Sequence, residues 1–327
     1  MKARLRIWAG IAVGLLFMYL ALRKISLQDL LVGFGNASYW PLFPCAALVL
    51  LAHLLRAFRW QVIMNALKMI RLGVLFSALM IGYVVNSVTP AHLGELVRAY
   101  LVGKEERIPV SAVLATVVIE RIIDIFSLLV LMFLAVFLYP FPDWVTQSGY
   151  MMLAGTLGLI FFLAIIRFHP VPSLRYLTWA CKFLPGGFGQ KITEAGESFI
   201  SGLVPLRRWY DYVTVSILSA AIWFCYGMVF HLSLYAFNFT ETYDANWLAS
   251  LLLLVITTIA VVIPSSPGYV GTYHYLCQLT LAMFMIPPGQ ALSFAAVVHL
   301  VNFIPVTVVG LLCAKRQGMA IIGEKKH

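Results

Sequence analysis

The sequence predicts an all-α, polytopic membrane protein with about six full spans and two re-entrant helical hairpins. Three observations predict this fold class: a very apolar composition, a series of long hydrophobic segments, and two hydrophobic segments interrupted by proline and glycine. Of the 327 residues, 62% are hydrophobic and only 11% are charged, and the mean hydropathy is +0.92. These values exclude a soluble globular domain of this length.

Six apolar segments are candidate spans, since a span needs about 20 residues. The shorter ones can cross with snorkelling ends. The first segment follows Lys2, Arg4 and Arg6 but lacks a small-x-small cleavage site after Leu22, so we expect a retained span. The segments are 7–22, 41–57, 125–138 with a polar approach from 110, 149–167, 210–237 and 290–314.

Two further apolar segments reverse direction at a break of the form Pro-x-x-aliphatic-Gly. The first reversal, within 72–107, centres on 88–95, and the second, within 247–286, centres on 264–271. Paired interruptions in corresponding parts of two halves indicate a membrane transport site. The alternative is a pair of continuous helices that are only kinked at proline.

Charge distribution favours the re-entrant interpretation. With both hairpins re-entrant, all 23 lysine and arginine residues except Arg23, Lys24 and Arg121 lie on the cytoplasmic side. A full crossing by 72–88 would invert everything that follows. We therefore expect one integral membrane domain over 1–327, both termini in the cytoplasm, and inverted pseudo-repeats over 7–138 and 149–314. The hairpin tips would then meet near the midplane around a polar cavity.

Outside the spans, the largest polar segment is 168–209. Its basic and apolar residues predict one or two amphipathic helices on the cytoplasmic surface, broken at 185–187. Such a surface attracts anionic lipid head groups, although a solvated connector that follows the positive-inside bias is an equal alternative. A shorter amphipathic stretch, 27–34, is expected at the outer interface.

Ionisable residues at membrane depth are functional candidates because their insertion is costly. Arg56 and Arg59 share a helix face, and a lipid phosphate is a suitable ligand for two guanidinium groups. The alternative is a pair of snorkelling anchors beside an interfacial Trp60.

The first hairpin offers a second group of candidates. The spacing of His92, Glu95 and Arg98 predicts a relay along one helix face. A helix that starts after Pro90 would also direct free N–H groups toward an anion. The alternative is a Glu95–Arg98 ion pair that only fixes the hairpin. The candidates at this tip are Asn86, Pro90, His92, Gly94, Glu95 and Arg98.

Glu120 and Asp124 form a third group, four residues apart on one helix, with Arg121 turned to another side. Two carboxylates at depth need a cation, and Arg98, Arg56 or Arg59 can supply it. This pairing could also be purely structural.

The second tip supplies hydroxyl groups, glycines that permit close backbone approach, and a helix N-terminus that favours a negative group. We expect His53, His231 and His299 to be packing residues. The candidates at this tip are Ser265, Ser266, Pro267, Gly268, Gly271, Thr272 and His274.

These motifs resemble the lysylphosphatidylglycerol synthase transmembrane-region family, also called flippase-like, which forms the N-terminal membrane half of the bacterial MprF proteins. The resemblance covers nearly the whole chain and implies lipid translocation by re-entrant helices around a lipid cavity. We expect no counterpart of the soluble aminoacyl-transferase domain of MprF and therefore no lipid aminoacylation. Tyr273 and His274 stand where many members carry an acidic residue. The motifs are Arg56-x-x-Arg59-Trp60, Asn86-x-x-x-Pro90-x-x-x-Gly94-Glu95-x-x-Arg98, 117–124 and Pro267-Gly268-x-x-Gly271-Thr272.

We therefore expect a flippase-type transporter of the bacterial inner membrane that moves a phospholipid or a lipid-linked glycolipid between leaflets. Its partners would be membrane lipids with an anionic phosphate head group. A homodimer is left open, and we expect no nucleic acid, cofactor or metal. One alternative is an integral membrane transferase for a lipid-linked sugar, with Glu120 or Asp124 as base. Another is a non-catalytic partner in lipid or glycan assembly.

Overall fold

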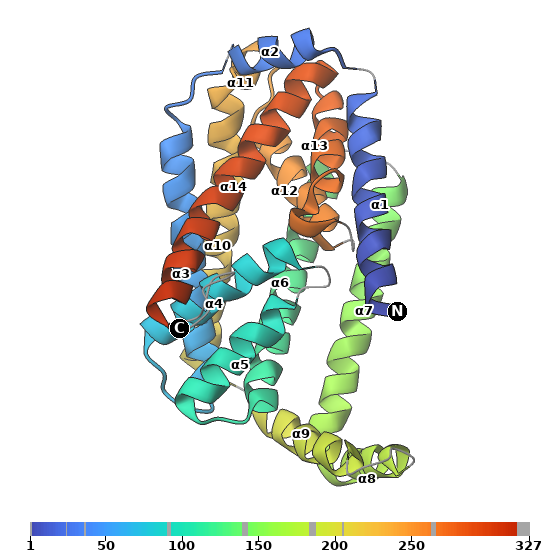
Figure 1. Cartoon of the computed structure of the whole chain (residues 1–327), viewed down its shortest axis with the longest axis vertical. Helices are drawn as coiled ribbons and strands as arrows, with labels where there is room; N and C mark the ends of the chain where they lie inside the picture. Colours follow the sequence, from blue (N-terminus) through green and yellow to red (C-terminus); the bar gives the residue numbers. More distant parts are fainter. Residues whose placement is uncertain are drawn as a thin grey trace, which may run out of the picture.

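The computed structural model describes residues 2–23, 25–35, 37–89, 93–138, 143–182, 188–204, 206–262 and 266–318. These residues form helices joined by short turns, without a strand among them (Figure 1). The predicted all-helical fold is confirmed. Six long helices coincide with the six predicted spans: α1 (Lys2–Leu22), α3 (Leu42–Met64), α6 (Val110–Leu138), α7 (Asp143–Phe168), α10 (Trp209–Ala236) and α14 (Pro288–Arg316).

Helix length and composition support a polytopic membrane protein. The shortest of the six, α1, has 21 residues, which at about 1.5 Å per residue matches a hydrocarbon core of about 30 Å. Among the described residues, α3, α10 and α14 are each long and apolar enough to cross a membrane, and α7 qualifies together with α8 (Pro170–Cys181) as a bent pair. The number of spans and the inverted repeat stay predictions.

Both predicted reversals are present as helical hairpins. The first pairs α4 (Leu72–Val88) with α5 (Gly94–Glu106), and the second pairs α12 (Trp247–Val262) with α13 (Thr272–Ala282) through the short 3₁₀ helix η2 (Pro267–Tyr269). They occupy the lower and upper halves of Figure 1. Their tips meet, since a Cβ atom added at Gly268 would lie 3.8 Å from the carbonyl oxygen of Ser87. Neither apolar segment is therefore an unbroken helix.

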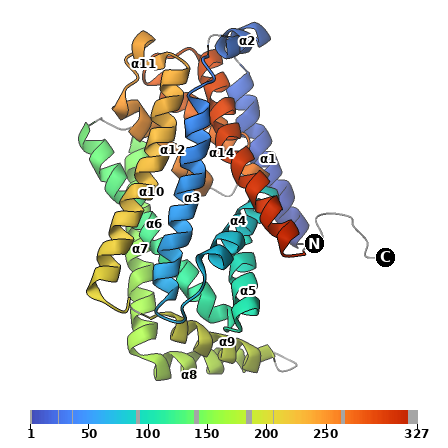
Figure 2. The same cartoon turned by 90° about the vertical axis from the view of Figure 1, so that its left-hand side faces the viewer.

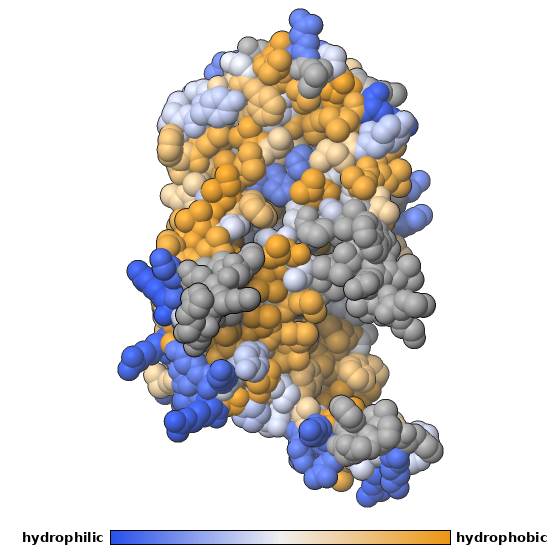
Figure 3. Space-filling view, viewed as in Figure 1, coloured by the Kyte–Doolittle hydropathy of each residue, from blue (hydrophilic) through white to orange (hydrophobic). Residues whose placement is uncertain are grey.

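The polar connector forms two helices, α8 and α9 (Phe188–Gly202), at one end of the molecule (Figures 1 and 2). The chain bends by 102° between α7 and α8. This confirms helices in the predicted connector, while the predicted break at 185–187 lies outside the described residues. Hydrophilic side chains gather at this end and at the neighbouring lower edge, whereas most of the remaining visible face is apolar (Figure 3).

At the opposite end, α2 (Leu27–Gly35) lies across the start of α14 (Figure 2). The Asp29 amide donates to the Ser26 hydroxyl at 3.2 Å, which caps α2. In return, the Ser26 hydroxyl and amide donate to the Asp29 carboxylate at 2.6 Å and 3.0 Å. These hydrogen bonds lower the pKa of Asp29. The Ser293 hydroxyl then donates to the Leu30 carbonyl at 3.0 Å and ties α14 to α2.

Two large apolar cores, and two smaller clusters, lie among the described helices. One joins α10, α12, α13 and α14 around residues such as Leu252 and Phe294. The other joins α3, α4, α5 and α6 around Trp60, Leu79 and Val102. The charged residues predicted at membrane depth lie on the helices of this second core.

Candidate functional site

A close contact between α4 and α5 shapes the first hairpin. A Cβ atom added at Gly94 would lie 1.9 Å from the Gly82 carbonyl oxygen, so only glycine permits this approach. The Gly94 amide donates to the Asn86 side-chain oxygen at 2.7 Å, so Asn86 occupies one of the free N–H groups at the start of α5. The predicted candidates Pro90 and His92 lie outside the described residues.

Glu120 on α6 is the centre of a buried ion-pair cluster. Its Oε2 accepts a hydrogen bond from Arg98 at 2.8 Å, and its Oε1 lies 3.3 Å from Arg56 and 3.5 Å from Arg59. Glu120 and Arg59 are fully buried, and the other two arginines are nearly so. Since Arg98 belongs to α5 and the other two arginines to α3, one carboxylate joins three helices.

Asp124 lies one turn further along α6 and binds the same pair of α3 arginines. Its Oδ1 lies 2.5 Å from Arg59, and its Oδ2 accepts a short hydrogen bond from Arg56. Arg121 lies between the two groups of charges, 2.7 Å from Glu95 and 3.7 Å from Asp124. The cluster therefore extends from α3 to the first turn of α5.

The structure confirms the predicted cations of the α6 carboxylates and changes one predicted pair. Arg56, Arg59 and Arg98 all contact these carboxylates. Glu95, however, pairs with Arg121, while Arg98 pairs with Glu120, so the alternative of a Glu95–Arg98 pair is replaced. The reason is burial: Arg98 is 3% exposed and meets the fully buried Glu120, whereas the partly exposed Glu95 meets the partly exposed Arg121.

The cluster carries more guanidinium than carboxylate. Among the described residues it holds four arginines and three acids, which leaves one net positive charge. The Nε atoms of Arg56, Arg59 and Arg98 and the Nη2 atom of Arg98 are buried without a hydrogen-bond partner. Buried donors without acceptors are unfavourable. An anion with several oxygen atoms, such as a phosphate, would supply both the missing charge and the missing acceptors.

Two side chains of α10 complete this cluster, and sequence reasoning missed both. The Ser219 hydroxyl accepts a hydrogen bond from Arg59 at 2.9 Å, and the Tyr226 hydroxyl accepts one from Arg56 at 3.4 Å. Their seven-residue separation, two helical turns, was the available signal. Apart from this spacing, nothing in the sequence distinguishes a neutral serine and tyrosine in an apolar span from packing residues.

Trp60 packs against the guanidinium group of Arg98. The Arg98 guanidinium lies 4.9 Å from the centre of the Trp60 ring, and the indole nitrogen donates to the Thr116 hydroxyl at 3.0 Å. Trp60 and Arg59 are both fully buried. The alternative of snorkelling arginines beside an interfacial tryptophan is therefore not the arrangement found.

The polar space at the first hairpin is small. A cavity of about 10 Å³ lies among residues that include Gly82, Asn86, Gly94, Arg98 and Arg121. It has room for about one water molecule. The polar cavity expected from the sequence is therefore small at this position.

The second tip is held by local contacts. The Ser266 hydroxyl donates to the Val270 carbonyl at 2.5 Å, and the Thr272 hydroxyl donates to the Tyr269 carbonyl at 3.2 Å. Gly268 has a φ of 67°, which favours glycine. Ser265 lies outside the described residues, and so does the side chain of Pro267.

Two other predicted residues of this tip face helices and not the arginine cluster. A Cβ atom added at Gly271 would lie 2.1 Å from the Gly14 carbonyl oxygen of α1, so this glycine permits helix packing. The Gly271 amide donates to His274 Nδ1 at 3.4 Å, and the His274 ring stacks on His299 at 5.0 Å. The N-terminus of α13 thereby has an acceptor of its own.

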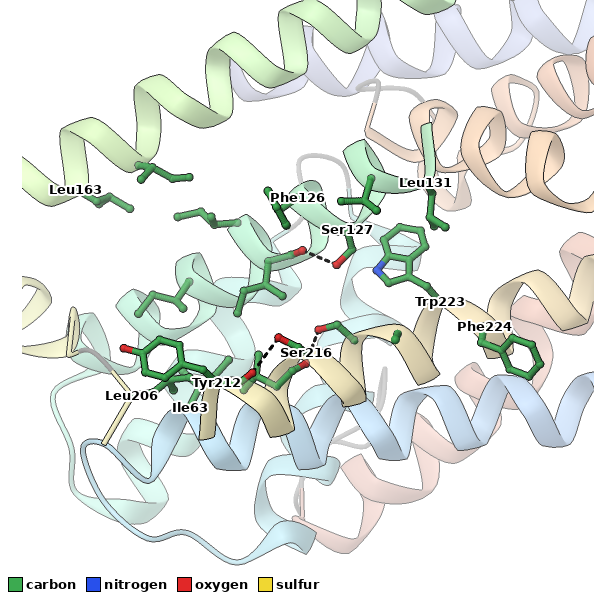
Figure 4. A pocket seen from close by; sticks show the side chains of 18 of the residues that line it. Ile63, Phe126, Ser127, Leu131, Leu163, Leu206, Tyr212, Ser216, Trp223 and Phe224 are labelled. Carbon is green, nitrogen blue, oxygen red and sulfur yellow. Dashed lines mark hydrogen bonds between the residues drawn. The ribbon is translucent and has the colours of Figure 1, made fainter. Parts of the chain in front are cut away.

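A large apolar groove lies on the other side of α6, where sequence reasoning predicted no site. It has a volume of about 1,100 Å³ and runs between α6, α7, α10 and α12 (Figure 4). Figure 4 shows Phe126 and Leu131 of α6 facing Trp223 of α10, with Leu163 of α7 opposite. Ser219 lines the groove and also binds Arg59, so one hydroxyl connects the groove to the charged cluster.

Comparison with known proteins finds membrane proteins from two archaea that are similar to this chain along most of its length. The UPF0104 membrane protein MJ1595 of Methanocaldococcus jannaschii is 23% identical over 319 residues, which cover 93% of this chain and 94% of that protein. A UPF0104 membrane protein of Methanothermobacter thermautotrophicus is 23% identical over 302 residues, which cover 86% and 87%. No solved structure matches the chain.

A family model described as the lysylphosphatidylglycerol synthase TM region matches residues 7–310. The match includes both hairpins, all of the buried ion-pair cluster and the helices that form the groove. The predicted resemblance is therefore confirmed, and the chain belongs to the lysylphosphatidylglycerol synthase transmembrane-region family.

Proposed function

We propose that this protein is a flippase-type transporter that moves lipids with an anionic phosphate head group between the leaflets of the cell membrane. The observation that carries the proposal is the surplus of buried guanidinium groups, with unpartnered N–H donors on Arg56, Arg59 and Arg98. The family description refers to a phospholipid, lysylphosphatidylglycerol, and supports a lipid as the substrate class. Ionisable groups buried in spans commonly belong to transport pathways.

The meeting hairpin tips supply a route for the head group. In the proposed orientation each hairpin enters the membrane from one side, so that movement of a single tip opens the site to one leaflet. A phosphate reaching Arg98 would exchange its contact with Glu120 for two parallel hydrogen bonds to phosphate oxygens. The carboxylates of Glu120 and Asp124 would keep the arginines paired before and after passage.

Reconstituted transport tests this proposal. We expect liposomes with the wild-type protein to expose a head-group-labelled phosphatidylglycerol to an impermeant quencher, and Arg98→Ala and Glu95→Gln to reduce the rate to that of protein-free liposomes. Arg98→Lys should retain only part of the wild-type transport rate, because an ammonium group cannot bind a phosphate bidentately.

Lys68→Ala is the matched control. Lys68 forms an ion pair with Glu106 at 2.7 Å, but its side chain is 46% exposed and lies away from the buried cluster. This variant should transport at the wild-type rate. Wild-type transport by both Arg98→Ala and Glu95→Gln would refute the assignment of the site.

A further inference from the structure

We propose that the groove between α6, α7, α10 and α12 is the entry site for a diacyl glycerophospholipid, with Arg167 at its mouth as the ligand of the lipid phosphate. The inference rests on the proposed function and adds where the substrate enters and which chemical parts of it are recognised. Arg167 belongs to neither hairpin and is separate from the buried cluster.

The mouth of the groove presents a positioned guanidinium. Arg167 stands in the last turn of α7, exposed, and its Nε donates to the Leu203 carbonyl at 3.1 Å. This bond fixes the plane of the group, whose terminal nitrogens are the donors that bind phosphate. Leu206 also lines the groove and is followed by the exposed Arg207 and Arg208, so the surroundings of the mouth are basic.

Beyond the mouth the groove suits hydrocarbon chains. Its lining is predominantly aliphatic and aromatic, and its volume of about 1,100 Å³ exceeds the range of about 300–1,000 Å³ typical of small-molecule sites. Along α10 it extends from Tyr212 to Gly227, about 22 Å at 1.5 Å per residue. One leaflet contributes only about 15 Å of hydrocarbon, so an acyl chain fits lengthwise.

The distribution of charge along the groove matches an amphiphilic ligand. One end of the groove is basic and the interior is apolar, which is the complement of an anionic head group on apolar chains. Ser219 lies about two turns of α10 beyond Tyr212 and binds Arg59. This hydroxyl, and through it the buried arginines, therefore lies about 10 Å along α10 from Tyr212, which lines the groove near the start of α10.

Photolabelling of the full chain tests the entry site without requiring transport. The probe is a phosphatidylglycerol carrying a diazirine in one acyl chain, incorporated into nanodiscs, and the labelled peptides are identified by mass spectrometry. Labels should map to α6, α7, α10 and α12. Arg167→Ala should weaken labelling about tenfold, a loss of one charge-assisted hydrogen-bonded contact, whereas Arg175→Ala on α8 should not change it.

A diacylglycerol with the same diazirine chain distinguishes phosphate binding by Arg167 from acyl-chain binding by the groove. It lacks phosphate, so its labelling should be weaker and insensitive to Arg167→Ala. Ala220→Trp, which adds an indole to the exposed Ala220 that lines the groove, should block both probes. Ile217→Trp is the matched control, since Ile217 is exposed on α10 and does not line the groove.

Photolabels that map outside these four helices would overturn the entry site. So would an equal effect on labelling of Arg167→Ala and Arg175→Ala, or of the two tryptophan variants. A change from dimer to monomer in Ala220→Trp with unchanged labelling would instead assign this face to a second copy. Labelling as expected with no transport would refute the proposed function and leave the entry site intact.

Discussion

At the scale of single residues, Glu120 is the side chain on which the buried cluster depends. It contacts three arginines from two other helices and is fully buried. A buried charge is tolerated only while its partners are present, because removing one partner leaves the others without solvation. The surplus of guanidinium makes this cluster more sensitive to loss of an acid than to loss of an arginine.

Glu120→Gln should therefore destabilise the protein by about 3–5 kcal/mol, the range for a broken buried ion pair. Thermal unfolding in detergent, followed by circular dichroism, measures the loss. Glu106→Gln is the control, since it removes the partly buried partner of the exposed Lys68 and should change stability by at most about 1 kcal/mol. Equal, small effects in both variants would show that the cluster is solvated.

The sequence predicted much of this cluster and little of its surroundings. Arg56, Arg59, Arg98, Glu120 and Asp124 could be found because charges in apolar segments are costly and need partners. The identity of each pair depends on helix rotation, which is why Glu95 was assigned to the wrong cation in one alternative. Neutral ligands such as Ser219 follow only from the packing of α10 on α3.

At the scale of elements, the two hairpins show what breaks a membrane helix and what closes the break. Proline and glycine at the tips identified both reversals in the sequence, and the hairpins are observed at the expected places. The first is held by the backbone contact of Gly82 with Gly94. The sequence could not predict the apolar groove, because it is a property of four helices that are distant along the chain.

Gly94→Ala tests the hairpin contact. The added methyl group would overlap the Gly82 carbonyl oxygen, so α4 and α5 must separate. This should lower the free energy of unfolding by about 1–3 kcal/mol. We expect a lower melting temperature and a lower yield of monodisperse protein. Gly73→Ala on α4 meets no atom within 4 Å and should leave the melting temperature unchanged or raise it. Equal behaviour of the two variants would contradict the contact.

At the scale of the whole molecule, the distribution of charge predicts the orientation of the protein in the membrane. The positive-inside distribution predicts that α8 and the loop after α5 face the cytoplasm. Single cysteines at Arg175 and Lys104, in a background without the five native cysteines, should react with an impermeant maleimide only in inverted vesicles. A cysteine at Arg23 should react only in right-side-out vesicles. Labelling of position 104 from the outside would show that α4 crosses completely.

The contact of Gly268 with Ser87 has a consequence for the membrane voltage. If the two hairpins enter from opposite sides and each admits water up to its tip during transport, the insulating layer between the aqueous solutions would be thinnest where the tips touch, and most of the membrane voltage would fall across a few residues. One elementary charge crossing that drop changes energy by about 2.3 kcal/mol per 100 mV. A negatively charged cargo would feel nearly the whole field in one short step, and an imposed potassium diffusion potential should speed its passage in one direction and slow it in the other.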